Sequence, residues 1–337
     1  MSFRSMPRPS TSLVLWLIFA ALSLAWGSSF LFIKVGVEEG LGPFTLVSYR
    51  LWIAVAFLSA VMVLTRGRLP RRDGGLRKLA SLAVINVAIP FSLITWGELY
   101  ISSALASILN GLVPLMVIVL AAFLLKDEPM TTNRVGGLIV GFAGAVLLLS
   151  PSLGTATAQV DEALVLLGEL AVVVACVFYA FSGIYIRRTI SGKPLVDDPR
   201  HGPRPARPAE IALPQCLVAT LITSSLALVF ERPGVGLPVP LPPTLPAWLA
   251  VAWLGVVGSG IAYLLFFRLI GAWGATRTSL VTYVMPIVGI SLGVLILHER
   301  LDAAEVIGAA LVIGGLVLAN SSFGQRRLFG RAAQQAR

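Results

Sequence analysis

Ten stretches of about 20 mostly apolar residues follow one another along this chain, and they constrain its fold more than any other feature. Lipid offers the backbone no hydrogen-bond partner, so a segment crosses the roughly 30 Å core of a bilayer as a helix that satisfies its own peptide groups. With 57% hydrophobic and 12% charged residues among 337, the chain carries far more apolar surface than a soluble domain can bury. We therefore predict an all-α integral membrane protein with ten transmembrane helices. The expected spans are Leu13–Val37, Phe44–Leu64, Leu79–Gly97, Ser102–Leu125, Arg134–Ser150, Ala163–Ile186, Ala209–Phe230, Ala247–Ile270, Gly274–Leu297 and Ala303–Ser321.

Arg4 and Arg8 precede the first span, as they would in a secretory signal. The apolar run that follows is longer than the roughly 7 to 15 residues of a cleaved signal core, and nine more spans come after it. We expect the first span to be retained as a helix.

The basic residues predict how these helices are oriented. If the N-terminus is inside and the chain crosses ten times, 22 of the 26 Lys and Arg residues fall in inside segments. An excess of Lys and Arg in cytoplasmic loops is the positive-inside rule. We therefore expect a multi-pass protein of the cell membrane with both termini in the cytoplasm, which fits a bacterial inner membrane. The net charge of +10 then reflects topology, and no nucleic-acid partner is expected.

A short phrase at the end of the fourth span returns at the end of the ninth. "KDE" (126–128) and "HER" (298–300) each follow an oily helix, and Pro114 precedes Glu128 by 14 residues as Pro286 precedes Glu299 by 13. Because this phrase recurs, we divide the chain into two five-helix repeats, residues 1–150 and 151–325, followed by a basic cytoplasmic tail at 326–337. We expect the two glutamates to be solvated residues at helix ends.

The first helix also has a twin in the second half. "AWGSSFLFIK" (25–34) matches "FYAFSGIYIR" (178–187), which pairs Trp26 with Tyr179 and Ser29 with Ser182. Because five crossings is an odd number, the second repeat enters the membrane from the opposite side, so the repeats are inverted. Inverted repeats are typical of secondary transporters, where the substrate site lies near the midplane and opens to each side in turn.

Several segments taken together resemble one transporter family. "WGSSFLFIKVG" (26–36), "WGELYISSALASILNGLVPL" (96–115), "YLLFFRLIGAWGATRTSLVTYVMPIVGISLGVLILHE" (263–299) and the Gly-rich fifth and tenth helices are similar to the EamA-type branch of the drug/metabolite transporter superfamily. The resemblance implies ten helices in inverted repeats and export of small metabolites such as amino acids. It also implies a cavity lined by the first, third, fourth, sixth, eighth and ninth helices. Residues 191–210 are longer and richer in Pro and Arg than that family leads us to expect, and we predict a disordered loop there.

Polar stripes on the spans indicate candidate cavity residues. In the fourth span Ser103, Ser107 and Asn110 share one helical face, and a similar stripe recurs in the ninth. Polar groups facing lipid are costly, so these stripes should face a cavity or hydrogen-bond another helix. For the aromatic candidates the alternative is anchoring at the membrane interface. The cavity candidates are Trp26, Ser29, Asn86, Trp96, Ser107, Asn110, Tyr179, Ser182, Tyr263, Thr278, Thr282 and Tyr283.

Four charged residues lie inside the predicted spans. Lys34, Arg50, Glu98 and Glu169 all fall in the outer third of the bilayer. Ionisable groups at such depth are expensive and tend to mark function. We interpret them as candidates for an extracellular gate or for ion coupling, with snorkelling to the headgroups as the alternative for Lys34 and Arg50.

The chain lacks the usual groupings of catalytic and metal-binding residues. Its only histidines, His201 and His298, fall in a loop and at a helix end, and Cys176 and Cys216 lie in separate spans without metal-ligand spacing. No P-loop is present. We therefore expect no metal, no cofactor and no enzymatic activity; the alternatives are a lipid flippase of the same superfamily or, further removed, a membrane enzyme. The expected partners are a small-molecule substrate and the lipid bilayer. The glycine stretches 136–144 and 308–315 are expected to pack helices closely, and they are compatible with a homodimer.

Overall fold

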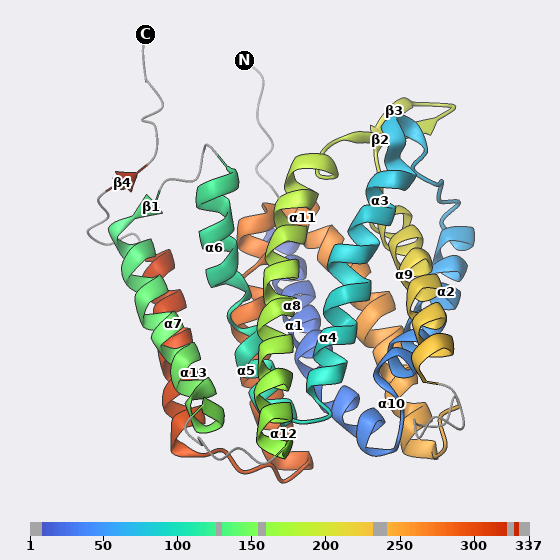
Figure 1. The fold of residues 1–337 in the computed structure, drawn as a ribbon. Helices are drawn as coiled ribbons and strands as arrows, with labels where there is room; N and C mark the ends of the chain where they lie inside the picture. The colour runs from blue at the N-terminus through green and yellow to red at the C-terminus, as the bar shows by residue number, and fades with distance from the viewer. Residues whose placement is uncertain (1–8, 126–129, 154–159, 232–240, 322–326, 330–337) are drawn as a thin grey trace.

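The computed structural model describes residues 9–125, 130–153, 160–231, 241–321 and 327–329. Within these ranges the chain is built almost entirely of helices, with two short pairs of antiparallel strands (Figure 1). The elements are α1 (Pro9–Glu38), α2 (Pro43–Leu64), η1 (Arg72–Gly74), α3 (Gly75–Ala83), η2 (Val84–Ala88), α4 (Ile89–Gly97), α5 (Ser103–Asn110), α6 (Val113–Leu124), β1 (Met130–Thr131), α7 (Thr132–Leu153), α8 (Val160–Thr189), β2 (Pro194–Asp198), β3 (Gly202–Pro205), α9 (Pro208–Phe230), α10 (Leu245–Gly255), η3 (Val256–Ile261), α11 (Ala262–Thr278), α12 (Val281–Ile296), α13 (Ala303–Asn320) and β4 (Arg327–Phe329).

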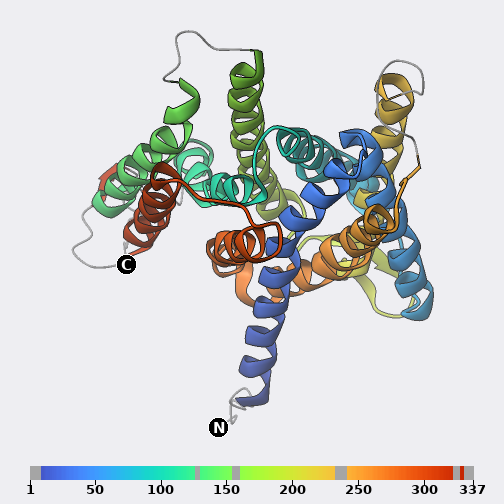
Figure 2. The same cartoon turned by 90° about the horizontal axis from the view of Figure 1, so that it is seen from below.

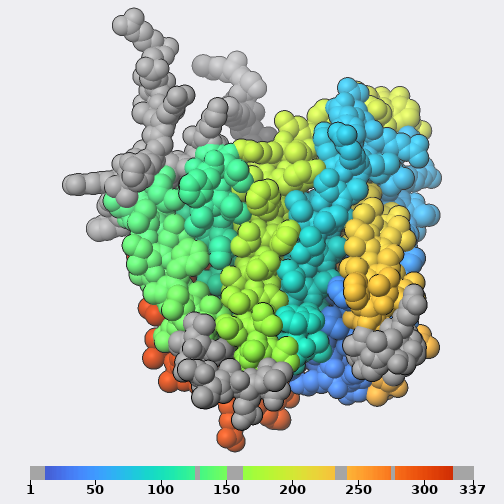
Figure 3. All heavy atoms as spheres, in the orientation of Figure 1, coloured from blue at the N-terminus to red at the C-terminus, as the bar shows by residue number. Residues whose placement is uncertain are grey.

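The described part of the chain holds nine helical stretches long and apolar enough to cross a membrane, together with the shorter apolar helix α12 of 16 residues. Several stretches join consecutive elements, such as α5 with α6 and α10 with η3 and α11. Figure 3 shows α7, α8, α4 and α9 side by side on one face of the molecule. Large apolar side chains are exposed on the helices, among them Phe123, Leu228 and Leu295, as a lipid-facing surface requires. The prediction of an all-α membrane fold with ten apolar helices is confirmed.

The two halves of the chain run in opposite senses. Helix α1 begins at the end of the molecule where both termini lie, whereas α8, which opens the second repeat, begins at the other end (Figure 1). Both repeats also share an irregularity: η2 in the third span and η3 in the eighth are π-helical. Pro286 lies 172 residues after Pro114, and Val256 lies 172 residues after Val84. The repeats therefore match in backbone detail as well as in sequence.

The fifth and tenth spans, α7 and α13, pack against each other at one edge of the molecule (Figure 2). Their glycines are the reason that they approach so closely. A Cβ atom at Gly144 would lie 2.8 Å from the carbonyl oxygen of Gly308, and one at Gly315 would lie 2.6 Å from that of Gly137. Strands β1 and β4 join the start of α7 to the segment after α13. These glycines are therefore covered by helices of the same chain.

Two adjacent glycines of α13 provide a matched test of this packing. A Cβ at Gly315 would meet only backbone atoms of α7, 2.5 to 2.8 Å away, whereas one at Gly314 would meet nothing within 4 Å. We expect Gly315→Ala to lower the unfolding temperature in detergent by about 2 to 8 °C, because the helices must separate. Gly314→Ala should leave it unchanged or slightly raised, since Ala is the better helix former. Thermal unfolding followed by size-exclusion chromatography measures both, and equal effects would contradict the packing described.

The segment expected to be disordered is an ordered hairpin, so that expectation was wrong. Strands β2 and β3 pair in antiparallel register, with Leu195 and Val196 buried. The guanidinium of Arg204 donates to both carboxylate oxygens of Glu210 at 2.7 and 2.8 Å, and Arg72 donates to Asp197 at 2.8 Å. Arg204, one of the arginines that suggested disorder, is paired with carboxylates, and Arg72 ties strand β2 to η1; these ion pairs order the segment.

The hairpin should be stable at every physiological pH. The backbone N–H of Arg200, followed by the guanidinium of Arg204, lowers the pKa of Asp198 to about 2. Its contribution is present above the unfolded pKa of about 4 and is lost as the pH falls through about 2. We expect hydrogen exchange in residues 194–205, corrected for the intrinsic rate, to be flat from pH 5 to 8 and several-fold faster in Arg204→Ala. The exposed Arg188→Ala is the control; unchanged exchange in Arg204→Ala would show that these ion pairs do not order the hairpin.

Candidate functional site: a central cavity between the repeats

A cavity of about 550 Å³ lies at the centre of the helix bundle. Its walls come from α1, α4 with η2, and α5 with α6 in the first repeat, and from α8, α11 and α12 in the second. Arg50 of α2, Arg134 of α7 and Asn320 of α13 complete the lining. The volume suits a small organic molecule.

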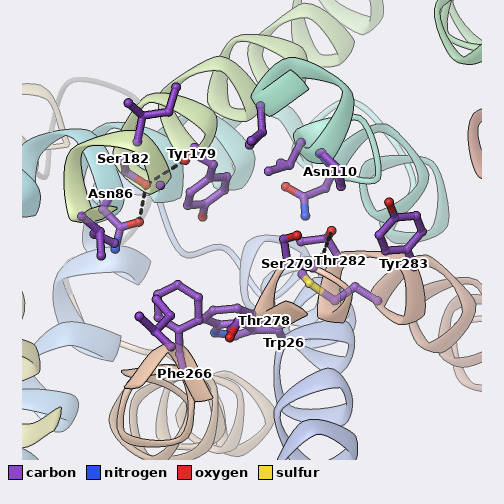
Figure 4. A pocket seen from close by; sticks show the side chains of 18 of the residues that line it. Trp26, Asn86, Asn110, Tyr179, Ser182, Phe266, Thr278, Ser279, Thr282 and Tyr283 are labelled. Atoms are coloured by element: carbon purple, nitrogen blue, oxygen red, sulfur yellow. Dashed lines mark hydrogen bonds between the residues drawn. The ribbon is translucent and has the colours of Figure 1, made fainter. Parts of the chain in front are cut away.

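Most of the expected cavity residues lie in this lining, and Figure 4 shows how they face one another. Trp96 and Ser107 do not. Trp96, near the end of α4, packs edge-on against Tyr100 with ring centroids 5.1 Å apart. Ser107 donates to its own helix at the Ala104 carbonyl and faces Gly289 of α12, where the absent side chain lets the two helices touch. The lining contains Trp26, Ser29, Asn86, Asn110, Tyr179, Ser182, Tyr263, Thr278, Thr282 and Tyr283.

A polar network crosses the cavity wall between the two repeats. The hydroxyl of Ser182 donates to Asn86 Oδ1 at 2.8 Å and also lies 2.8 Å from the Tyr179 carbonyl oxygen (Figure 4). The phenol of Tyr263 donates to the Asn86 carbonyl at 3.4 Å. Asn86 sits in the π-helical segment η2, and such segments frequently occur at functional sites. The network therefore ties the third span to the sixth and eighth.

Arg50 is the one charged residue among the four intramembrane candidates that lines the cavity. Only 2% of its surface is exposed. Its Nε donates to the hydroxyl of Ser259 at 3.3 Å, and its guanidinium carbon lies 4.1 Å from the centre of the Phe91 ring. Ser259 belongs to η3, so one π-helical segment contributes Asn86 to the cavity lining and the other holds Arg50.

The other three charged candidates are placed away from the cavity lining. The ammonium of Lys34 donates to the backbone carbonyls of Glu98 and Ile101 at 3.0 and 3.1 Å, which ties the end of α1 to the turn between α4 and α5. Glu98 is fully buried and Glu169 is 2% exposed. No salt bridge joins Arg50 to Glu98 in the part of the chain described. The hypothesis of an extracellular gate therefore stays a prediction. Lys34 lies at the turn between α4 and α5, whereas Arg50 lines the cavity.

Glu299 holds the start of another helix, which the sequence reasoning missed. Its carboxylate accepts hydrogen bonds from the backbone N–H groups of Ser103 and Ala104 at 2.8 and 2.9 Å, and from the Ser103 hydroxyl at 3.1 Å. Glu299 therefore caps α5 across the repeat boundary. The expectation that it is a solvated residue at a helix end was wrong. Its twin Glu128 lies outside the described residues. The only sequence signal for this capping role was that a glutamate recurs at the same place in both repeats.

The cavity extends toward one end of the molecule. Leu125, Arg134, Arg187 and Ser191 belong to its lining and lie where α6, α7 and α8 meet the end that carries both termini. At the opposite end, Lys34 and Glu299 hold the start of α5 in place. No described loop residue at that end belongs to the lining, so the described part of the chain closes the cavity there.

Comparison with known proteins supplies the family. The sequence model of the EamA-like transporter family matches residues 11–150 and 166–321, one match for each repeat. The chain belongs to the EamA-like transporter family. Its membership agrees with the resemblance seen in the sequence, and it makes the chain a multi-pass membrane transporter.

Similar proteins extend over nearly the whole length of this EamA-like transporter. An uncharacterized transporter of Archaeoglobus fulgidus is 26% identical, covering 90% of this chain and 97% of its own. A protein of Escherichia coli K12 named a probable amino-acid metabolite efflux pump is 23% identical, covering 88% of this chain and 91% of its own. A protein of known crystal structure with 22% identity superposes with a TM-score of 0.61 over 91% of this chain and 96% of that one, and thus shares the fold.

The Glu299 cap can be tested by the accessibility of the closed end. A cysteine at Ile101, which is 4% exposed there, reports on opening, and the native Cys176 and Cys216 are buried. A hydrogen bond to a charged acceptor contributes about 1.5 to 3 kcal/mol. Glu299→Gln removes the charge from the acceptor of these backbone hydrogen bonds. We expect maleimide labelling of purified Ile101→Cys protein to become at least several-fold faster.

The control is Glu305→Gln, because Glu305 caps only its own helix through Asp302. That change should leave the labelling rate of the Ile101→Cys protein as it was. A labelling rate that Glu299→Gln does not alter would show that the carboxylate is not what keeps this end closed.

Proposed function

We propose that this chain is a secondary transporter that exports small organic metabolites across a bacterial inner membrane by alternating access. The observation that carries the proposal is the cavity, which lies between the two repeats, is lined by twinned spans of both, and among the described residues extends toward one end of the molecule. A midplane site between inverted halves is the arrangement from which such transporters expose a substrate to each side in turn.

The orientation supports export. The basic segments η1 to α3 and β2 to β3 lie at the end where α1 begins, as the positive-inside rule expects of a cytoplasmic face (Figure 1). With both termini in the cytoplasm, the cavity extends toward the compartment where metabolites are made. The efflux pump of E. coli named above supports amino acids and their metabolites as the substrate class.

We assign no enzymatic activity to the chain, and a homodimer is not required. The small-residue stripes that are compatible with a dimer contribute glycines to the contact between α7 and α13.

A metabolite comparison tests the proposal directly. Medium from cells that overexpress the protein should contain at least one organic solute in several-fold excess over medium from a deletion strain, measured by mass spectrometry. Asn110→Trp, which places a large ring in the cavity, should abolish the excess. The matched control is Val146→Trp, at a position 61% exposed on α7, which should export as the wild type does. A medium that does not change with expression, or full export by Asn110→Trp, would refute the proposal.

A further inference from the structure

Arg50 is a buried cation whose hydrogen-bonding capacity is largely unused. A guanidinium carries five N–H donors, and Nε uses one of them on the Ser259 hydroxyl. No described residue accepts a hydrogen bond from its terminal nitrogens Nη1 and Nη2, and no carboxylate lies within 4.0 Å in the described chain. These two nitrogens are not fully buried polar atoms that lack a partner, because Arg50 borders the cavity. The free part of the guanidinium thus faces the space where a substrate would lie.

The residues around Arg50 fix its position without neutralising it. The Phe91 ring covers one face of the guanidinium at 4.1 Å, and Ser259 holds the Nε edge. An aromatic face and a hydroxyl orient a cation, but neither supplies a negative charge. Glu98 forms no ion pair with Arg50 within 4.0 Å in the described part of the chain. A buried charge in such a setting is expensive until an anion arrives.

The rest of the cavity lining favours the same kind of ligand. Its described residues include Arg50 and neither Asp nor Glu. Beside Arg50, aromatic rings form an apolar wall, with Trp26 packed on Phe266 at 5.1 Å and near Tyr263 at 6.3 Å. The lining therefore offers a cation for one end of a ligand and an apolar surface for its body. None of its described residues is acidic and could pair with an ammonium group.

We propose that Arg50 binds the carboxylate of the transported solute, so that the cavity recognises organic anions with an apolar or aromatic body and does not require an amino group. This inference rests on the proposed transport function and names its substrate class. The two terminal nitrogens match the two oxygens of a carboxylate in a bidentate pair, which is stronger and more directional than a single hydrogen bond. Phe91 and Ser259 hold that fork toward the cavity.

The test compares ligands that differ only in their charged group. Full-length protein in lipid nanodiscs is titrated with 3-phenylpropionate, its neutral amide 3-phenylpropanamide, the cation phenethylamine and the zwitterion phenylalanine. We expect the two carboxylates to bind at least tenfold more tightly than the amide and the cation. Equal affinity for the carboxylate and the amide, tighter binding of phenethylamine, or no binding of 3-phenylpropionate would each overturn the inference.

Variants of Arg50 locate the effect. Arg50→Gln should weaken 3-phenylpropionate at least tenfold while leaving the affinity for 3-phenylpropanamide unchanged, which also reports that the cavity is folded. Arg50→Lys, which keeps the charge but loses the planar fork, should fall between, and it replaces Arg50→Gln if that variant does not fold. Arg188→Gln, an exposed arginine outside the lining, should bind as the wild type does. Full carboxylate affinity in the Arg50 variants would contradict the assignment.

The two proposals fail in different ways. If the solutes that accumulate in the medium of overexpressing cells lack a carboxylate, the transporter proposal stands and the role of Arg50 is wrong. If no solute accumulates although 3-phenylpropionate binds through Arg50, the site is as proposed and export is wrong.

Discussion

Every peptide group inside a bilayer must find its hydrogen bond within the protein, and the arrangement of the two repeats follows from this constraint. Helix ends that lie inside the bundle are the difficult places, because their first amides have no partner in their own helix. Here carboxylates from the second repeat accept hydrogen bonds from such amides in the first repeat. Glu299 holds the start of α5, and Glu231 at the end of α9 accepts the amides of Phe44 and Thr45 at the start of α2, each at 2.8 Å. The two repeats are therefore joined by backbone hydrogen bonds as well as by side-chain packing.

The same constraint shapes the walls of the cavity. A π-helical turn inserts an extra residue into a helix while the helix remains hydrogen-bonded, so it changes the direction of side chains at low cost in lipid. The turns η2 and η3 occupy corresponding positions in the two repeats. One carries Asn86 into a network with Ser182, and the other carries Ser259 to Arg50. Irregularities shared by both repeats thus supply polar groups at the centre of an apolar bundle.

The two ends of the bundle differ because their polar groups are used differently. Toward the end away from the termini, Lys34 donates to backbone carbonyls and Glu299 accepts hydrogen bonds from backbone amides. These two charged groups therefore hold helices together. Within the cavity, Arg50 keeps donors that have no partner among the described residues. The first use stabilises a closed end, and the second leaves a site that a ligand can complete.

Much of this molecule was determined by its sequence alone. The apolar periodicity set ten helices, the recurring phrases set two inverted repeats, and the polar stripes pointed to residues such as Asn86 and Asn110 that line the cavity. Composition and spacing reveal these features because lipid penalises a misplaced polar group wherever it occurs.

What only the tertiary structure decided is which neighbour each polar group meets. Ser107 shares its stripe with Asn110 but faces Gly289 of another helix, and the Arg-rich segment 191–210 is ordered because Arg204 reaches Glu210. Glu299 reaches Ser103, which is 196 residues away in the chain. Such pairings depend on distances between helices that are remote in sequence, and a one-dimensional pattern does not contain those distances.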